Sequence, residues 1–274
     1  MKKIRFGIIG CGLMGKEFAS SAARWCHFTE KITRPEIVAV CDFSDAAMDW
    51  FSDNFDSVVF RTKDYKELLK REDIDAVYCA LPHNLHGQVY SDIINAGKHL
   101  LGEKPFGIDQ AANAQIMEAI KNHPEVVVRC ASEFPYYPAC QQLINWIKEG
   151  KFGQIIEVRT GFCHSSDMDL SKPINWKRMV EINGEYGCMG DLGIHTQHLP
   201  FRMGWMPKSV YANLSNIAKE RRDKNGNMVP CETWDNAVLS CEVEDKDGNE
   251  FPMFMETKRM KPGATNEWYI RVEG

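Results

Sequence analysis

Short apolar runs alternate with stretches of helical periodicity through the first half of the chain. The apolar runs cover residues 4–9, 37–41, 58–60, 76–80, 99–102 and 126–131, and the helical stretches lie near 14–24, 45–54, 64–70, 86–96 and 108–122. Buried runs joined by helical crossovers are typical of a parallel sheet covered on both faces, so the pattern predicts a doubly wound α/β domain. Right-handed crossovers bring the carboxyl ends of the strands to one edge, where such sheets bind ligands.

The pattern changes after residue 131. A Phe-Pro-Tyr-Tyr-Pro segment at 134–138 is followed by an amphipathic helix predicted over residues 139–149. Beyond it, period-two alternation predicts strands near 154–163, 209–218, 235–244 and 250–258, with the Asp-Gly-Asn segment at 247–249 as a hairpin turn. We therefore expect a doubly wound domain over residues 1–132 and an α+β domain with a mainly antiparallel sheet over residues 133–274.

Composition and charge narrow the class of protein. The 274 residues carry 33 Lys and Arg against 38 Asp and Glu, a formal charge of −5, and 44% of them are hydrophobic. This balance supports a sizeable core and excludes a disordered chain. Nucleic acid is not expected as a partner, because the chain has no basic surplus. The apolar runs all fall short of the roughly 18 residues of a membrane span, so we expect a soluble protein with no membrane partner.

Ten cysteines are scattered through apolar segments and form no Cys-x-x-Cys pair. In a chain of this length they are expected to be reduced core thiols rather than a disulfide framework. Because disulfides are rare where thiols are kept reduced, this usage favours the cytoplasm.

A glycine-rich segment follows the first predicted strand and opens the first predicted helix. The pattern G-x-G-x-x-G is fulfilled by Gly10, Cys11, Gly12, Leu13, Met14 and Gly15. In this motif the first glycine permits a tight turn, the second lets a pyrophosphate approach the backbone, and the third lets helix and strand pack closely. A glycine-rich turn without a ligand is the alternative. The strand-turn-helix setting favours dinucleotide binding on a Rossmann-type sheet.

Asp42 ends the second predicted strand, where a carboxylate can accept hydrogen bonds from the adenosine ribose and would repel a 2′-phosphate. NAD is therefore predicted in preference to NADP, although Arg34 from a preceding loop could reach an extra phosphate. Asp42 could instead be a helix N-cap or a turn acid.

Two more loops follow predicted strands at the ligand edge, and we predict that both contact the cofactor. They contribute Leu81, Pro82, His83, Asn84 and His86 after the fourth strand, and Glu103 and Lys104 after the fifth. Lys104 would stabilise a developing alkoxide beside the nicotinamide. Alternatively, it is a solvated surface lysine. The Lys104-Pro105 peptide bond is a candidate for the cis form.

Asp191, His195 and His198 lie at positions i, i+4 and i+7 of a predicted helix, which puts them on one face. His195 suits general acid-base chemistry near neutral pH, and Asp191 could orient it or bind a substrate hydroxyl. Trp176 and His198 are further candidates for substrate contact. The alternatives are a solvated face, an N-cap role for Asp191, and a metal site. No further ligand clusters with them in the sequence, so no metal is predicted.

Together these motifs resemble the Gfo/Idh/MocA oxidoreductase family, which includes inositol dehydrogenases and glucose-fructose oxidoreductase. The resemblance covers nearly the whole chain and rests on the glycine fingerprint and on segments at 82–86, 103–105, 144–153 and 191–195. It implies hydride transfer between NAD(P) and a sugar, polyol or related hydroxy compound, with Lys104, Asp191 and His195 in the family's catalytic positions. It also implies homo-oligomers, dimers or tetramers, formed through the carboxy-terminal sheet.

Some segments depart from the family pattern. Glu-Tyr-Gly at 185–187 replaces three glycines, His198 stands where many members have an aspartate, and the segment at 133–135 replaces one that often carries arginine. These departures leave the substrate open. The chain also stops at Gly274 inside a predicted strand, so we expect it to lack the segment that usually follows. Two alternatives to a dehydrogenase are an NAD-dependent glycosidase that oxidises its substrate transiently, and a nucleotide- or sugar-sensing protein without catalysis.

Overall fold

The computed structural model describes residues 2–30 and 32–274. The chain forms two compact units, Met1–Ala131 and Ser132–Gly274, and each is described by itself. Within the described ranges, no helix has both the length and the apolar character needed to cross a bilayer.

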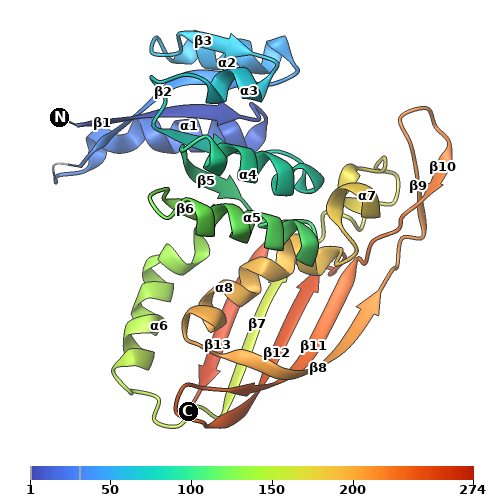
Figure 1. Ribbon diagram of the computed structural model, residues 1–274. Coiled ribbons are helices and arrows are strands. Elements are labelled where there is room, and N and C mark those ends of the chain that lie inside the picture. The colour runs from blue at the N-terminus through green and yellow to red at the C-terminus, as the bar shows by residue number, and fades with distance from the viewer. Residues whose placement is uncertain (1, 31) are drawn as a thin grey trace. The chain divides into compact units, whose positions relative to one another are not determined.

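The first unit contains a six-stranded parallel sheet in the order β3-β2-β1-β4-β5-β6 (Figure 1), which confirms the doubly wound prediction. Its strands are β1 (Lys3–Ile9), β2 (Arg34–Cys41), β3 (Phe60–Thr62), β4 (Ala76–Cys79), β5 (His99–Glu103) and β6 (Val128–Ala131). Its α-helices are α1 (Leu13–Ala23), α2 (Asp45–Asn54), α3 (Tyr65–Leu69), α4 (His86–Asn95) and α5 (Gln110–Asn122).

Helices cover both faces of this sheet, as neighbouring residues of β1 show. Ile8 packs with residues of α1 and α2, whereas Ile9 packs with residues of α3, α4 and α5. Successive side chains of a strand point to opposite faces, so a strand covered on both sides must be apolar without interruption. The apolar runs of the sequence arise from this double burial.

The third strand lies two residues later than predicted, at Phe60–Thr62 instead of 58–60. Val58 packs against the core as part of a loop, and Val59 is 70% exposed while its backbone N-H donates to Val38 O. Because β3 is an edge strand, one side of it faces no neighbouring strand, and its sequence does not need a continuous apolar run. The sixth strand is shorter than predicted, because it begins at Val128 instead of at residue 126.

The second unit contains a five-stranded sheet in the order β13-β7-β12-β11-β8. Its pairs are antiparallel except for β12 with β7, so the mainly antiparallel prediction is confirmed. Its strands are β7 (Glu157–Cys163), β8 (Met206–Ser215), β11 (Asn236–Glu244), β12 (Glu250–Lys258) and β13 (Glu267–Glu273). Compared with the predictions, β7 begins three residues later and β8 is displaced toward the N-terminus by three residues.

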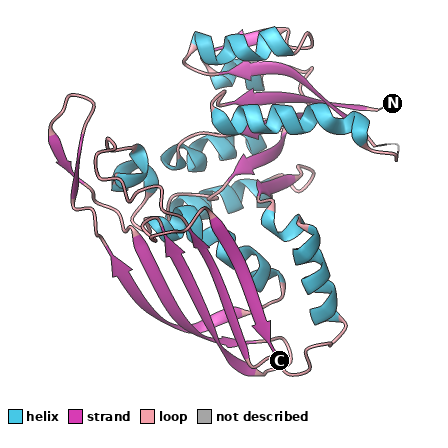
Figure 2. Ribbon diagram, turned by 180° about the vertical axis from the view of Figure 1, so that it is seen from behind, coloured by secondary structure: helices cyan, strands magenta, loops and turns pink. Residues whose placement is uncertain are grey.

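Helices α6 (Pro138–Lys148) and α8 (Ile194–Arg202) lie on one face of this sheet, where Ile144 and Leu199 pack together with the partly buried Trp268 of β13. Figure 2 shows the strands from behind, and no helix of the second unit's described residues crosses that face. The short helix α7 (Val180–Asn183) lies among the loops at one end of the sheet. The predicted hairpin turn joins β11 to β12, with Gly248 at φ 83°.

A second hairpin, formed by β9 (Glu220–Arg222) and β10 (Met228–Pro230), was not predicted. It protrudes beyond the five-stranded sheet in Figure 1. Its sequence is highly charged, yet Arg221 is only 2% exposed. The Arg221 guanidinium donates to the backbone carbonyls of Asp167 (2.6 Å), Asp169 (2.8 Å) and Lys172 (3.2 Å). A charged residue is buried here because it satisfies loop carbonyls, and binary patterning does not register that role.

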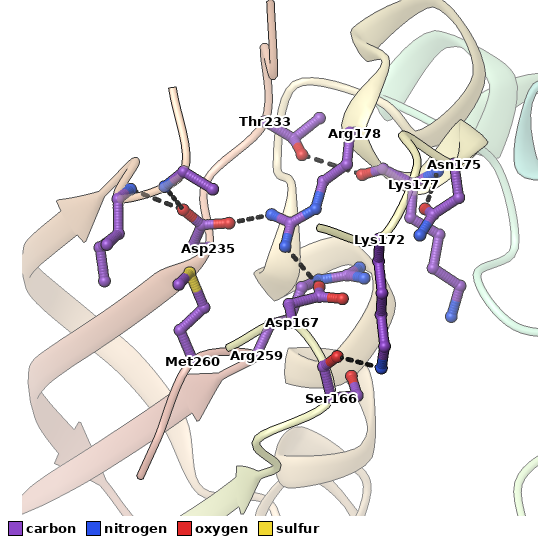
Figure 3. Close-up of polar contacts among 12 residues, drawn as sticks. Ser166, Asp167, Lys172, Asn175, Lys177, Arg178, Thr233, Asp235, Arg259 and Met260 are labelled. Carbon is purple, nitrogen blue, oxygen red and sulfur yellow. Dashed lines mark hydrogen bonds and ion pairs between the residues drawn. The ribbon is translucent and has the colours of Figure 1, made fainter. Parts of the chain in front are cut away.

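A buried ion pair network fastens the loops at this end of the sheet. Arg178 is fully buried and donates to the carboxylates of Asp167 and Asp235, as Figure 3 shows. Asp235 also accepts the backbone N-H groups of Ile217 (2.5 Å) and Ala218 (2.8 Å). Four separate segments are thereby joined through the Arg178 guanidinium and the Asp235 carboxylate.

Arg178→Met is expected to lower the free energy of unfolding by about 3–5 kcal/mol, because it leaves two buried carboxylates without their cation. Urea unfolding measures the change. The matched control is Arg271→Met on β13, whose side chain is 69% exposed and pairs with Glu273 at the surface. That variant should stay within about 0.5 kcal/mol of the parent. Equal stability of the two variants would contradict the role given to Arg178.

Candidate functional site

The glycine turn between β1 and α1 has two glycines enforced by packing and one that faces open space. A Cβ on Gly10, which has φ 95°, would lie 2.2 Å from Ala80 O, and a Cβ on Gly15 would lie 2.3 Å from Gly10 O. A Cβ on Gly12 would meet no atom within 4 Å. Gly12 immediately precedes Leu13, the first residue of α1. Open space at a helix N-terminus fits the pyrophosphate of a dinucleotide.

Asp42 ties this turn to the end of β2. Its Oδ2 accepts the backbone N-H of Cys11 (2.8 Å), and its Oδ1 accepts that of Ser44 (2.8 Å). The N-cap of α2 is Ser44, whose Oγ accepts the N-H of Ala47 (3.2 Å), so Asp42 is not the cap. Burial, followed by the charge of Asp42, raises the pKa of the Cys11 thiol to about 12. The Cys11 thiol is therefore uncharged, and the negative charge at this turn is carried by Asp42.

His86 joins the loop after β4 to the loop after β5. Its Nδ1 lies 2.6 Å from Pro105 O and its Nε2 lies 2.9 Å from Leu81 O, while the ring stacks on Tyr90 with centroids 4.6 Å apart. Burial lowers the pKa of His86 although both carbonyls act to raise it. Both ring nitrogens thus face backbone carbonyls of the protein itself, and the His86 side chain connects the two loops.

The other predicted residues of these loops lie at the carboxyl ends of β4 and β5, which are neighbours in the sheet. Leu81, Pro82 and Lys104 are half-buried, Asn84 is exposed, and His83 is buried. The buried Glu103 carboxylate accepts the hydroxyl of Tyr78 (2.7 Å). The Lys104-Pro105 bond is cis, which confirms that prediction.

In the second unit, Asp191 does not lie on a regular α-helix. It belongs to a π-helical turn at Met189–Gly193, and α8 begins only at Ile194. The α-helical spacing predicted for Asp191, His195 and His198 is therefore wrong at its first member. Asp191 is 1% exposed, and its Oδ2 accepts Lys177 Nζ (2.9 Å) and Arg259 Nη2 (2.6 Å). These contacts also exclude the solvated-face and N-cap readings of Asp191.

The imidazole of His195 lies against aromatic rings. It is 7% exposed and meets Phe134 (4.8 Å between centroids) and Phe162 (5.5 Å) in edge-on geometry. The ring of His198 lies 6.3 Å from that of His195, and burial, followed by the charge of Arg202, lowers the pKa of His198. The candidate proton carrier His195 thus packs against two aromatic rings, which exclude water on those sides.

Three residues near Asp191 were missed by the sequence analysis. Lys177 lies 5.6 Å from the ring centroid of Trp176, which begins a 3-10 turn, and Arg259 follows β12. His164 follows β7, and its pKa is lowered by burial first and by the charge of Arg259 second. Proximity to Trp176 could have suggested Lys177. The sequence holds no comparable signal for Arg259 or His164. Among the described residues, no group of three or more His, Cys, Asp and Glu side chains is arranged to hold a metal ion.

Comparison with known families assigns both units. The profile described as "Oxidoreductase family, NAD-binding Rossmann fold" matches residues 4–130, and the GFO/IDH/MocA C-terminal domain profile matches residues 140–263. The first unit is therefore an NAD-binding Rossmann domain. The chain belongs to the Gfo/Idh/MocA oxidoreductase family, which confirms the resemblance found in its motifs.

Among its curated relatives, levoglucosan dehydrogenase of Pseudarthrobacter phenanthrenivorans is 26% identical over 82% of this chain and 57% of its own length. Inositol 2-dehydrogenase of Salmonella paratyphi B is 25% identical over 57% of this chain and 44% of its own length. The chain thus spans about half the length of these relatives. A solved structure of levoglucosan dehydrogenase with NADH superposes with a TM-score of 0.89 at 23% identity, covering 100% of this chain and 71% of that one. This likeness shows the shared fold.

Gly12→Ala is expected to weaken NADH binding at least about tenfold, equivalent to about 1.4 kcal/mol, because its methyl group would occupy the space facing the pyrophosphate. Thermal unfolding should be unchanged, since that methyl group meets no protein atom within 4 Å. Fluorescence titration with NADH measures the binding. Gly15→Ala is the contrasting variant and should lose stability, because its methyl group would lie 2.3 Å from a backbone oxygen. Parental affinity in Gly12→Ala would show that the cofactor lies elsewhere.

Proposed function

We propose that this chain is an NAD-dependent dehydrogenase that transfers hydride between the cofactor and a CH-OH group of a sugar or polyol. The observation that carries the proposal comes from the second unit. A buried, ion-paired carboxylate is followed four residues later by an imidazole that packs against aromatic rings. Asp191 and His195 provide that pair in a chain whose first unit is an NAD-binding Rossmann domain. A hydroxyl acceptor and a proton carrier are the groups that alcohol oxidation requires.

Each residue has a distinct role in this proposal. NAD, when bound, supplies the hydride acceptor. His195 accepts the proton of the reacting hydroxyl, because imidazole is the side chain that titrates near neutral pH. Lys104 stabilises the alkoxide that develops on that oxygen. Asp191 accepts a hydrogen bond from a neighbouring hydroxyl and thereby fixes which carbon reacts. Trp176 and His198 are proposed as further substrate contacts.

NAD is proposed in preference to NADP. A 2′-phosphate would meet the carboxylate of Asp42 at the end of β2. The basic side chains of the neighbouring strand β3 and the residue after it are paired with acids of α2: Arg61 with Asp49 (2.6 Å) and Lys63 with Asp45 (2.7 Å). Pairing within the protein reduces the attraction that these cations offer to a phosphate.

The substrate class follows from the relatives' names, which refer to levoglucosan, inositol and a dTDP-linked deoxyglucose. We propose a compound of the same kind, with adjacent hydroxyls on a ring. The hydrogen-bonding side chains of Asp191 and His195 and the proposed aromatic contact of Trp176 suit such a compound, because each hydroxyl requires a partner and each ring face requires apolar contact.

The test measures the production of NADH from NAD, or of NADPH from NADP, with a panel of sugars and cyclic polyols. His195→Asn should lower kcat by about 10²–10⁴-fold, the usual contribution of general acid-base catalysis. Lys104→Met should lower it by about 10²–10³-fold, the usual effect of removing one group that stabilises developing negative charge. His27→Asn and Lys121→Met change exposed side chains and serve as matched controls. Unchanged turnover in His195→Asn would reject its role as the base. Sugar release without net NADH would indicate the glycosidase alternative, and NADH binding without turnover would indicate the sensing alternative.

We further propose a homo-oligomer formed through the helix-free face of the five-stranded sheet. Tyr211 and Val238, which lie on that face, are 71% and 41% exposed. Apolar side chains gathered on an exposed sheet favour an interface. Light scattering after size exclusion should give a mass of at least twice the 31.3 kDa of the chain. Val238→Asp should shift the mass toward the monomer, and a monomeric parent at all concentrations would contradict the proposal.

The cytoplasm is the proposed compartment. All ten cysteines are free thiols, and most are buried. Buried free thiols fit a reducing compartment, and recovery of the native chain with disulfides among them would count against it.

A further inference from the structure

Two cations from separate segments bind the same oxygen of Asp191. Arg259 Nη2 lies 2.6 Å and Lys177 Nζ lies 2.9 Å from Asp191 Oδ2. The side chains of Asp191 and Arg259 are 1% and 3% exposed, whereas that of Lys177 is 37% exposed. We propose that Arg259, assisted by Lys177, is a positioning residue that fixes the Asp191 carboxylate as a hydrogen-bond acceptor for the substrate. The inference rests on the proposed dehydrogenase function.

The backbone of Arg259 is anchored by the buried network around Arg178. Arg259 N-H donates to Asp235 O (3.0 Å), and Asp167 N-H donates to Arg259 O (3.3 Å). Asp167 and Asp235 are the two carboxylates that bind Arg178. Arg259 therefore emerges from a segment that the network holds on both sides, and its guanidinium reaches Asp191 from a fixed base.

Lys177 is anchored in a similar way, directly before Arg178 in the chain. Its N-H donates to Asn175 Oδ1 (3.0 Å), and its carbonyl accepts the hydroxyl of Thr233 (2.9 Å), as Figure 3 shows. The two segments that supply cations to Asp191 are thus both fixed by contacts to other loops. Movement of either segment would require breaking the network.

The chemistry of this arrangement separates the roles of Asp191 and His195. A buried carboxylate is costly unless cations and hydrogen bonds compensate its charge. Here one oxygen receives two charge-assisted hydrogen bonds, so adding a proton to the carboxyl would oppose two neighbouring positive charges. Asp191 is thereby confined to accepting hydrogen bonds. This leaves His195 as the proton acceptor of the proposed mechanism.

A purely structural arginine would give a different result from a positioning arginine, and the chain offers a matched control. Arg221 is also buried, at 2% exposed, but its guanidinium binds the backbone carbonyls of the loop at 167–172. Loss of either arginine removes a buried cation and its hydrogen bonds. Only Arg259 contributes one of those bonds to Asp191.

Arg259→Met should lower kcat about 100-fold in the full chain, the usual effect of displacing a reacting geometry by about 1 Å. The KM for NAD should not change. Arg259→Lys should recover part of the loss, because it retains a cation. Arg221→Met should lower thermal stability but leave kcat near the parental value. If the two methionine variants lose activity equally and in proportion to stability, the inference is overturned.

A second pair of variants changes lysines that are at least partly exposed, so the expected cost to folding is smaller than for Arg259→Met. Lys177→Met removes the half-exposed cation, and Lys172→Met removes a lysine of the neighbouring loop whose Nζ binds Ser166 O (2.7 Å). Lys177→Met should lower kcat about tenfold, or about 1.4 kcal/mol in the barrier, and Lys172→Met should not change it. Equal kcat in both variants would count against the role of Lys177 in positioning Asp191.

A measurement without turnover separates this inference from the proposed function. In protein labelled with ¹³C at the aspartate carboxyl carbon, Asp191→Asn identifies the resonance of Asp191. That resonance should shift in Arg259→Met and stay in place in Arg221→Met. An unshifted resonance in Arg259→Met overturns the positioning role of Arg259, whether or not the enzyme oxidises a sugar. If the resonance shifts in Arg259→Met but the parent oxidises none of the sugars, the positioning role of Arg259 is supported and the dehydrogenase proposal is rejected.

Discussion

Burial of charge is the constraint on which the second unit depends. Arg178 is inaccessible to water, so its guanidinium must be matched by carboxylates, and Asp167 and Asp235 come from two different loops to provide them. A buried pair contributes little over apolar packing, but breaking it is costly. The network thus acts less as a source of stability than as a restriction on the loop conformations that the chain can adopt.

The first unit solves a different problem, the close approach of backbone segments. At Gly10 and Gly15 a side chain would collide with a backbone oxygen. The absence of side chains at these two positions therefore lets β1, β4 and α1 pack close together. At Gly12 no such collision exists, so protein packing does not require a glycine there, and the open space is where we propose that the cofactor pyrophosphate lies. Asp42 then fixes the turn from the side through the N-H of Cys11. Glycine is therefore required by protein packing at two positions, and at the third its proposed reason is cofactor binding.

Much of this could be predicted from the sequence, because local patterns encode it. Double burial produced the apolar runs, and the strand-turn-helix setting gave meaning to the glycines. What failed depends on partners distant along the chain. Arg221 looks like part of a solvated charged run until the carbonyls at 167–172 close around it. Arg259 lies 68 positions from Asp191, and no periodicity links them. The proposed catalytic residues come from sequence motifs, whereas the cations that contact Asp191 emerged only from the tertiary structure.

The π-helical turn at Met189–Gly193 makes this region sensitive to the length of the chain. An α-helix advances by about 100° per residue, and a π-turn accommodates one residue more than an α-turn. Deletion of one residue between Asp191 and His195 would rotate one of them relative to the other by about that angle. The carboxylate would leave its two cations while the imidazole kept its aromatic neighbours. A chain that differs by one residue between these two positions would thus present the same carboxylate and imidazole in a different relative orientation.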